Sequence, residues 1–246
     1  MSTIETNETP FSRQVALIGE DATRKLNFAS VCVVGLGGVG GYVCEMLARC
    51  GVGKIHLVDC DTVSVSNLNR QIIALNSTVG KKKTKVTSLR ISDINPDCTV
   101  TSEDIFITAE NAYNFVRSCG CSVIADCIDN VTAKTALIKA AVENGKYIIS
   151  SMGTGNKTDS SLFRIADISE TNTCPLARAV RKLLKQNGIT KNVDVLFSTE
   201  LPCSTATRQP SSICYAPAIA GIMIAEHIIK KIISNAGNEN GRSINF

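Results

Sequence analysis

Charged side chains that suit nucleotide chemistry recur along the first half of this chain. Arg13, Arg70 and Lys83 could converge on a triphosphate and neutralise the charge that grows as a phosphoryl oxygen leaves. Asp129 offers the hard carboxylate oxygens that magnesium prefers. Each residue alone has a simpler interpretation, as a surface ion pair for Arg70, a solvated helix face for Lys83 and a helix cap for Asp129. They form a site only if the fold brings them to one edge.

A glycine-rich stretch precedes most of these residues. Gly35, Gly37 and Gly40 fit the pattern G-x-G-x-x-G, after the apolar run 31–34 and before apolar residues at helical spacing. Such a turn brings backbone N–H groups against a phosphate and packs the next helix closely on its strand. Asp59 follows about twenty residues later, where a carboxylate can accept hydrogen bonds from ribose hydroxyls. The alternative is a glycine turn that serves packing alone.

The elements that must position these residues alternate between strand and helix, which is typical of a parallel sheet. We predict a Rossmann-like, doubly wound α/β fold with a mainly parallel sheet and antiparallel additions in the C-terminal half. A helical segment should run from Gln14 to near Phe28. The expected strands are 31–34, 55–58, 99–105, 121–128, 147–151, 161–167 and 193–198, and the other helices are 41–50, 77–94, 109–118, 133–144, 175–186 and 216–233.

Length and composition indicate one large domain. With 246 residues, 44% of them apolar, the chain suits a single domain over residues 11–234, with flexible tails at 1–10 and 235–246. The polar N-terminus resembles neither a signal peptide nor a transit peptide, and charges interrupt the most apolar segment, 216–233. We therefore expect a cytoplasmic protein without a membrane span. The net charge of +4 permits a nucleic-acid partner without indicating one.

The eleven cysteines are interpreted first as reduced thiols. Several lie inside apolar runs, and the sequence has no C-x-x-C pair from which a zinc site could be built. We therefore predict no zinc site. Cys203 and Cys214, near the polar stretch 199–212, are candidates for a catalytic thiol, and an ordinary thiol is the alternative for each.

Together these motifs resemble the ThiF family of adenylating proteins, which includes the thiamine- and molybdopterin-pathway activators and the ubiquitin-activating enzymes. The resemblance extends from Phe11 to Ile233. The ordered motifs that carry it are Ser12-Arg-Gln14, Gly35-Leu-Gly-Gly-Val-Gly40, Asp59-Cys-Asp61, Ser66-Asn-Leu-Asn-Arg-Gln71, Val79-Gly-Lys-Lys-Lys83 and Asp126-Cys-Ile-Asp129-Asn130.

This resemblance implies a role for each matching residue. ATP would bind with magnesium at Asp129, and a carboxylate would attack the α-phosphate to give an acyl adenylate and pyrophosphate. Arg13, Arg70, Lys83 and Asp129 would be catalytic, with Cys214 as a further candidate. The nucleotide-binding residues would be Gly37, Gly38, Asp59, Asp61, Ser66, Asn67, Arg70, Lys83, Asp129 and Asn130.

Within the family, the later half is most similar to the tRNA threonylcarbamoyladenosine dehydratases. These enzymes adenylate the carboxylate of the threonylcarbamoyl group, after which an internal nucleophile closes a ring and expels AMP. The absence of paired zinc cysteines favours the same subgroup. The residues that carry this similarity are Gly153-Thr-Gly155, Phe163-Arg-Ile-Ala-Asp167, Pro175-Leu-Ala-Arg178, Val195-Leu-Phe-Ser-Thr-Glu200 and Ser211-Ser-Ile-Cys-Tyr-Ala-Pro217.

Two departures and two alternatives stay open at this point. Cys174 stands where the family usually has an aspartate, and the loop from Leu201 to Ser212 is short, so no catalytic cysteine is securely placed. Intramolecular ring closure needs none. One alternative is an adenylating activator of a ubiquitin-like or sulfur-carrier protein. The other is a catalytically weak scaffold or regulatory partner, which the presence of Arg70, Lys83 and Asp129 argues against.

The expected partners follow from one basic helix and from the family. Arg178, Arg181, Lys182 and Lys185 suit a tRNA phosphate backbone, or they form a merely solvated face. The resemblance implies a homodimer in which Arg13 of one subunit completes the site of the other. It also allows a sulfur-transfer or carrier-protein partner.

Overall fold

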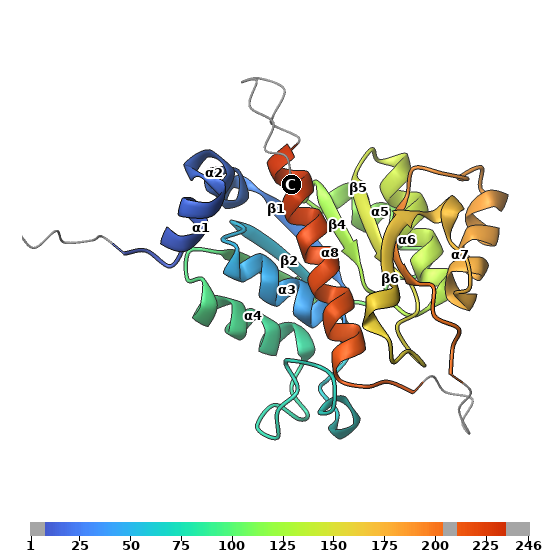
Figure 1. The fold of residues 1–246 in the computed structure, drawn as a ribbon, viewed down its shortest axis with the longest axis horizontal. Coiled ribbons are helices and arrows are strands. Elements are labelled where there is room, and N and C mark those ends of the chain that lie inside the picture. Colours follow the sequence, from blue (N-terminus) through green and yellow to red (C-terminus); the bar gives the residue numbers. More distant parts are fainter. Residues whose placement is uncertain (1–7, 204–210, 235–246) are drawn as a thin grey trace, which may run out of the picture.

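The computed structural model describes residues 8–203 and 211–234. In this part of the chain, strands form one sheet in the order β3-β2-β1-β4-β5-β7-β6 (Figure 1). All neighbouring strands are parallel except β6 and β7, which are antiparallel. The predicted mainly parallel sheet with an antiparallel addition is therefore confirmed. The bounds are β1 (Ser30–Val34), β2 (Lys54–Val58), β3 (Thr99–Glu103), β4 (Val123–Asp126), β5 (Tyr147–Ser151), β6 (Phe163–Asp167) and β7 (Asp194–Ser198).

The strand order reverses beside β1, and this reversal creates a crevice. From β1 the chain adds β2 and β3 on one side, and β4 then returns to the other side of β1. Val34 is in register with both Val58 and Asp126, so β1, β2 and β4 end level with one another. The polar residues that follow these strands consequently start from one edge. Open α/β sheets bind ligands at such an edge.

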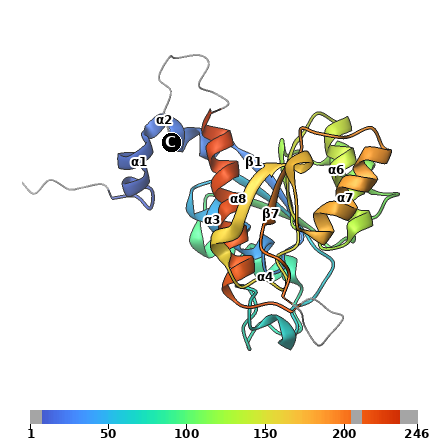
Figure 2. The same cartoon turned by 45° about the vertical axis from the view of Figure 1, so that its right-hand side comes forward.

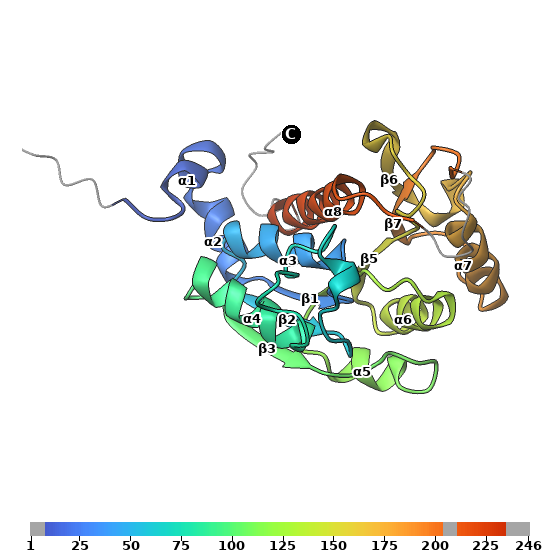
Figure 3. The same ribbon diagram turned by 90° about the horizontal axis from the view of Figure 1, so that it is seen from below.

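Helices cover both faces of the sheet (Figures 1 and 3). Successive residues of β1 face opposite sides of the sheet. Val31 and Val33 belong to the core cluster that includes residues of α3, α4 and α8, whereas Cys32 and Val34 belong to the cluster that includes residues of α5, α6 and α7. Burial on both faces explains why the apolar run of this strand is continuous rather than alternating. The bounds are α3 (Gly40–Arg49), α4 (Lys83–Ile94), α5 (Ala112–Ser118), α6 (Val131–Glu143), α7 (Pro175–Gln186) and α8 (Tyr215–Ser234).

The N-terminal segment forms two helices, so the prediction of one helical segment is wrong. α1 (Ser12–Ile18) and α2 (Glu20–Phe28) are separated by Gly19, whose φ of 86° is accessible mainly to glycine and interrupts the helix. Leu26 of α2 is buried in the core, whereas α1 contains no buried residue. In Figures 1 and 2, α1 lies at the outer edge of the molecule, far from α6 and α7.

The helix predicted from residue 77 begins at Lys83. Before it, Gly80 has a φ of 85° and donates its N–H to the Val63 carbonyl at 2.8 Å, while the Val63 N–H donates to the Lys81 carbonyl at 2.8 Å. The residues before Lys83 therefore pair with the segment after β2 instead of continuing the helix. Gly80 is the local signal that could have revealed this turn. The later start places Lys83 in the first turn of α4, close to the end of β2.

Several other boundaries differ from the prediction. β4 stops at Asp126 rather than residue 128, so Asp129 lies in the turn before α6 and not at the end of a strand. β3 stops at Glu103, and α5 begins at Ala112 because Thr108 donates its backbone N–H to Asn111 Oδ1 at 2.8 Å in a turn. None of the helices within residues 8–203 and 211–234 combines the length and the apolar character that a membrane span requires.

Candidate active site

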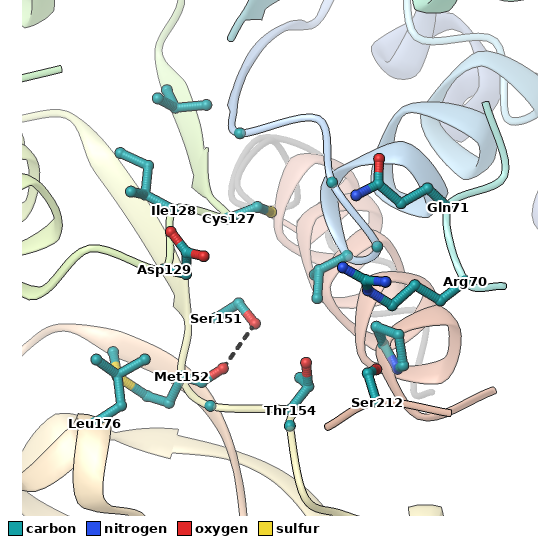
Figure 4. A pocket seen from close by; sticks show the side chains of 18 of the residues that line it. Arg70, Gln71, Cys127, Ile128, Asp129, Ser151, Met152, Thr154, Leu176 and Ser212 are labelled. Atoms are coloured by element: carbon teal, nitrogen blue, oxygen red, sulfur yellow. Dashed lines mark hydrogen bonds between the residues drawn. The ribbon is translucent and has the colours of Figure 1, made fainter. Parts of the chain in front are cut away.

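A cavity of about 660 Å³ opens at the carboxyl ends of β1, β2, β4 and β5 (Figure 4). One wall, here called the nucleotide wall, comprises the glycine turn and the residues after β2. The opposite wall, here called the acceptor wall, comprises residues after β5 and at the start of α7. The nucleotide wall includes Gly35, Gly37, Gly38, Asp59, Asp61, Asn67, Arg70, Gln71 and Lys83, and the acceptor wall includes Ser151–Lys157, Cys174–Leu176, Pro202 and Ser212.

The glycine turn is built for close approach of backbone to backbone. Gly35 has a φ of 89°, and a Cβ there would lie 2.8 Å from the Cys127 carbonyl oxygen. A Cβ on Gly40 would lie 1.8 Å from the Gly35 carbonyl oxygen, which no side chain tolerates. Gly37 and Gly38 lie between them and line the cavity. The predicted G-x-G-x-x-G turn is therefore present at the start of α3, where backbone N–H groups can face a phosphate.

Asp59 holds this turn in place. One carboxylate oxygen, Oδ2, accepts the Leu36 N–H at 2.7 Å, and the other, Oδ1, accepts the Asp61 N–H at 2.8 Å. Asp59 also lines the cavity, which is the position expected for a ribose contact. Its carboxylate thus links the phosphate turn to the residues after β2.

Lys83 is fixed at the cavity by an ion pair. Its side chain is 7% exposed, and its Nζ lies 2.8 Å from Asp61 Oδ2. The hydrogen bond from Lys83 lowers the pKa of Asp61, and its effect outweighs partial burial, which acts in the opposite direction. An ammonium group held in one place can stabilise phosphate charge without first being ordered. Its exposed neighbours Lys81 and Lys85 lie outside the cavity lining.

Arg70 reaches the cavity from a loop that its own hydrogen bonds order. Its Nη1 donates to the Ser66 carbonyl at 2.8 Å and to Asn69 Oδ1 at 2.9 Å. Asn67 is buried and lines the cavity, and its Oδ1 accepts the Ser64 N–H at 3.0 Å. Ser66 itself does not line the cavity, and its hydroxyl pairs with that of Ser64 at 2.9 Å. The predicted nucleotide contact of Ser66 is therefore not prepared in this structure.

Gln71 is a polar residue of this wall whose role the motif alone did not assign. Its side chain is 7% exposed, and its Oε1 has no hydrogen-bond partner among the described residues. Gln71 lines the cavity beside Gly37 (Figure 4). An unsatisfied buried amide oxygen costs free energy, so a ligand donor at this point would relieve that cost.

Asp129 extends into the cavity opposite Arg70 (Figure 4). The helix-cap role that was its alternative belongs to Asn130, whose Oδ1 accepts the Ala133 N–H at 2.9 Å. No side chain of the described residues pairs with the Asp129 carboxylate. Its oxygens are therefore available to a ligand, whereas the Asn130 side chain is engaged and lies outside the cavity lining.

A buried ion pair shapes the turn that carries Asp129. Asp126 and Lys134 have fully buried side chains, and Lys134 Nζ lies 2.8 Å from Asp126 Oδ2. Ser150 donates its hydroxyl to the same oxygen at 2.6 Å, while Asp126 Oδ1 accepts the Ile128 N–H at 3.1 Å. These contacts connect β4, β5 and α6 next to the turn that carries Asp129. A pair this deeply buried is tolerated only because its remaining lone pairs are also hydrogen-bonded.

Other predicted residues do not meet at the cavity. Arg13 is exposed on α1 and is absent from the cavity lining, so one copy of the chain does not bring it to the site. Cys214 and Cys203 are exposed and are also absent from the lining, although their neighbours Ser212 and Pro202 belong to it. Cys174 is buried at the N-cap of α7 and does line the cavity.

The basic helix α7 is only partly available for nucleic acid. Arg178, Lys182 and Lys185 are exposed. Arg181 is instead half-buried, and its guanidinium donates to the carbonyl and the hydroxyl of Thr171. Arg181 therefore anchors the helix to the loop before it, so three of the four basic residues predicted to contact tRNA are exposed.

The chain was then compared with known proteins. Residues 11–246 match the ThiF family. The chain is 39% identical to the tRNA threonylcarbamoyladenosine dehydratase of Bacillus subtilis over 242 residues, which are 92% of this chain and 95% of that protein. It is 41% identical to the Escherichia coli enzyme of the same name over 77% of this chain and 73% of that protein.

A solved structure agrees with these similarities. The E. coli tRNA threonylcarbamoyladenosine dehydratase, in complex with ATP, superposes with a TM-score of 0.89 and 36% sequence identity, over 94% of this chain and 96% of that one. The seven-stranded sheet and its two layers of helices are therefore the fold of that enzyme. The family match, the sequence identity and the fold agree, and the chain belongs to the ThiF family.

Proposed function

We propose that this protein is an ATP-dependent tRNA threonylcarbamoyladenosine dehydratase. The observation that carries the proposal is the convergence of the glycine turn, Asp59, Arg70, Lys83 and Asp129 on one cavity at the switch point of the sheet. The similarity to dehydratases extends over almost the whole chain, so it includes the acceptor wall as well as the nucleotide wall. We assign residues 11–234 to a single adenylating domain.

ATP binds along the nucleotide wall in this proposal. Asp59 accepts the ribose hydroxyls, and the amides at Gly37 and Gly38 face the phosphates. Asp61 contributes by holding Lys83, whose ammonium lies at the cavity with Arg70 on the same wall. Both cations stabilise the charge that accumulates on the phosphates as pyrophosphate leaves. Asn67 and Gln71 supply the remaining polar contacts.

Asp129 fits a magnesium ion that accompanies ATP. Its carboxylate is exposed, lies in the cavity and has no partner side chain among the described residues, and carboxylate oxygens are the ligands that magnesium prefers. When bound, the ion would neutralise phosphate charge. Asn130 supports this site indirectly, since it caps α6 and fixes the residue before it.

The acceptor wall receives the modified adenosine. A carboxylate oxygen of the threonylcarbamoyl group attacks the α-phosphate, the bond to the leaving pyrophosphate breaks, and an acyl adenylate forms. A nucleophilic atom within the same group then attacks the activated carbonyl carbon, loses its proton and expels AMP. The lost oxygen departs in AMP, so the nucleoside loses the elements of one water.

This reaction needs no cysteine, because ring closure within one group already has a high effective concentration of the nucleophile. Cys214 remains our candidate if a thioester intervenes, since it is exposed two residues after Ser212. Cys203 is less suited, because its thiol is already directed at Glu200, with 4.0 Å between Sγ and the accepting Oε1.

The tRNA backbone contacts α7 in this proposal. The helix begins at the cavity, where Pro175 and Leu176 line the acceptor wall, and its exposed cations lead away from it. Arg178, Lys182 and Lys185 can therefore neutralise phosphates while the modified base lies in the cavity.

We also propose a homodimer in which Arg13 acts in the partner's site. The motif Ser12-Arg-Gln14 belongs to the family resemblance, but α1 lies at the outer edge of a single copy and buries none of its residues (Figure 1). A second copy would give this exposed helix a function. A mixture of Arg13→Ala chains with Asp129→Asn chains tests the idea, because mixed dimers would hold one site with both native residues and regain part of the activity.

The direct test of the proposed function is dehydration of the nucleoside. The protein is incubated with ATP, magnesium and tRNA bearing threonylcarbamoyladenosine. The tRNA is then digested to nucleosides, and their masses are measured by mass spectrometry. The proposal predicts loss of one water from that nucleoside only when ATP is present. AMP formation with a carrier protein but not with this tRNA would instead favour an activator of ubiquitin-like or sulfur-carrier proteins.

A further inference from the structure

We propose that Asn156 is a positioning residue that holds segment 211–217 against the acceptor wall and so helps to bind the tRNA substrate. The inference rests on the proposed function, because it assigns a role within that reaction. Its basis is a set of hydrogen bonds made by residues 156–159, which follow β5. These bonds reach residues up to 203 and residues from 211 onward, the two described segments of the chain.

Asn156 bonds to a residue of each segment, Cys203 and Ser211. Its Oδ1 accepts the Ser211 N–H at 2.7 Å, and its own N–H donates to the Ser211 carbonyl at 2.8 Å. Its carbonyl accepts the Cys203 N–H at 2.9 Å. Asn156 therefore contacts both Cys203 and Ser211, and it lines the cavity.

Neighbouring residues reinforce the same connection. The Glu200 carboxylate accepts the Thr158 N–H at 3.0 Å and the Asp159 N–H at 3.1 Å. The Tyr215 hydroxyl donates to the Thr158 carbonyl at 2.9 Å. Glu200 thus connects the segment before residue 203 to residues 158 and 159. Ser211 and Tyr215 connect the segment after residue 211 to Asn156 and Thr158. Both the side-chain oxygen and the backbone N–H of Asn156 bond to Ser211, the first residue of segment 211–217.

Segment 211–217 then crosses to the nucleotide wall. Ser212 lines the cavity and is drawn below Arg70 in Figure 4, and its carbonyl accepts the Asn69 Nδ2–H at 3.3 Å. At the other end, a Cβ on Gly38 would lie 3.1 Å from Pro217 Cβ. The segment consequently forms part of the cavity boundary between the two walls, and its position decides how much room the acceptor side has.

Asparagine suits this position for two reasons. Its φ is 56°, a left-handed conformation that asparagine, aspartate and glycine adopt more easily than other residues. Its side chain also provides the acceptor for Ser211. Replacement by glycine keeps the backbone conformation and removes only this acceptor, so Asn156→Gly isolates the hydrogen bond. Asn156→Asp keeps an acceptor oxygen and should restore the parent's behaviour in part.

The chain provides a matched control at Asn192. This asparagine also has a left-handed backbone, with a φ of 66°, but it is exposed between α7 and β7 and lies outside the cavity lining. Asn192→Gly therefore makes the same chemical change without touching segment 211–217. A general effect of added glycine would appear in both variants, whereas the proposed effect belongs to Asn156→Gly alone.

The experiment compares four full-length proteins: the parent, Asn156→Gly, Asn156→Asp and Asn192→Gly. Hydrogen exchange by mass spectrometry reports on the peptide that contains Ser211, and steady-state kinetics report on dehydration. In Asn156→Gly we expect faster exchange at Ser211 and a KM for tRNA raised about fivefold, the effect of losing one hydrogen bond. ATP affinity by calorimetry and kcat should stay within about twofold of the parent.

Each result separates this inference from the proposed function. Parent-like exchange and parent-like KM for tRNA in Asn156→Gly would overturn the role of Asn156. A loss of ATP affinity as large as the rise in the KM for tRNA would also overturn it, because the residue would then support the whole cavity and not the acceptor side alone. Failure of the parent to dehydrate the tRNA would overturn the proposed function, and the exchange data would still decide whether Asn156 holds Ser211.

Discussion

The two walls of the cavity are built from contacts of different range. On the nucleotide wall, Asp59 bonds to Leu36 and Asp61 pairs with Lys83 across only 23 and 22 residues of sequence. On the acceptor wall, Asn156 bonds to Ser211 across 55 residues, and Thr158 bonds to Tyr215 across 57. The nucleotide wall is therefore a compact unit that short motifs specify. The acceptor wall depends instead on contacts between segments that are far apart in the sequence.

The largest expected effect of a substitution at the nucleotide side is at Asp129. Asp129→Asn removes the charge that suits magnesium, so substrate-dependent AMP formation should fall by about two to three orders of magnitude, while some ATP binding remains. The variant should melt as the parent does, because Asn130 is the helix cap. By contrast, Asn130→Ala should lower the free energy of unfolding by about 1 kcal/mol. Parent-like AMP formation by Asp129→Asn would show that the magnesium assignment is wrong.

Lys83→Met should have the next largest effect. The substitution keeps much of the buried volume but removes the ammonium that pairs with Asp61, so kcat should fall by about a hundredfold. Lys85→Met, on the same helix but exposed and outside the cavity, is the matched control and should turn over normally. Equal rates for the two variants in a steady-state AMP assay would show that the Lys83 ammonium does not contribute to the reaction.

Asp59→Ala should act on binding more than on chemistry. It removes the expected ribose acceptor together with the anchor of the Leu36 N–H, and the Kd for ATP should rise by roughly tenfold. Calorimetry measures the affinity, and thermal melting confirms that the variant is folded. An unchanged Kd in a folded variant would refute the ribose assignment.

Charge reversal on α7 should have the smallest effect on catalysis and should act on tRNA affinity. Arg178→Glu combined with Lys182→Glu should weaken tRNA binding and reduce the slope of log K against log salt by about 0.9 for each phosphate that the helix no longer neutralises. Arg181→Gln should instead lower stability with little change in that slope, since its guanidinium bonds to Thr171. If the double variant kept both affinity and slope, the tRNA would bind elsewhere.

The sequence predicted the nucleotide wall well because its contacts are local. Asp59 and Lys83 of this wall follow recognisable motifs, as does Asp129 across the cavity from Arg70, and the structure brings all three to the cavity. The predicted helix start at residue 77 was wrong, because the prediction followed the spacing of apolar residues and ignored Gly80. The positive φ of Gly80 interrupts the helical backbone before Lys83. Local spacing also failed to show that Asn130, and not Asp129, caps α6.

The acceptor wall was less predictable for a physical reason. Asn156 and Glu200 have no periodic pattern around them, and their partners lie far along the chain. Arg181 looked equivalent to its basic neighbours, since its partner Thr171 belongs to a loop rather than to the helix. The position of Arg13 depends on a second copy of the chain in our proposal, which no intramolecular pattern can reveal.

The most direct test of the adenylation chemistry follows one oxygen atom. Threonylcarbamoyladenosine in tRNA is prepared with its carboxylate enriched in the heavy oxygen isotope, and the reaction is run with ATP and magnesium in ordinary water. Attack by the carboxylate on the α-phosphate predicts that the AMP released carries one heavy oxygen, while the cyclised nucleoside has lost one. Unlabelled AMP formed in step with the dehydrated nucleoside would contradict the account, because the carboxylate would then never have been bonded to the α-phosphate.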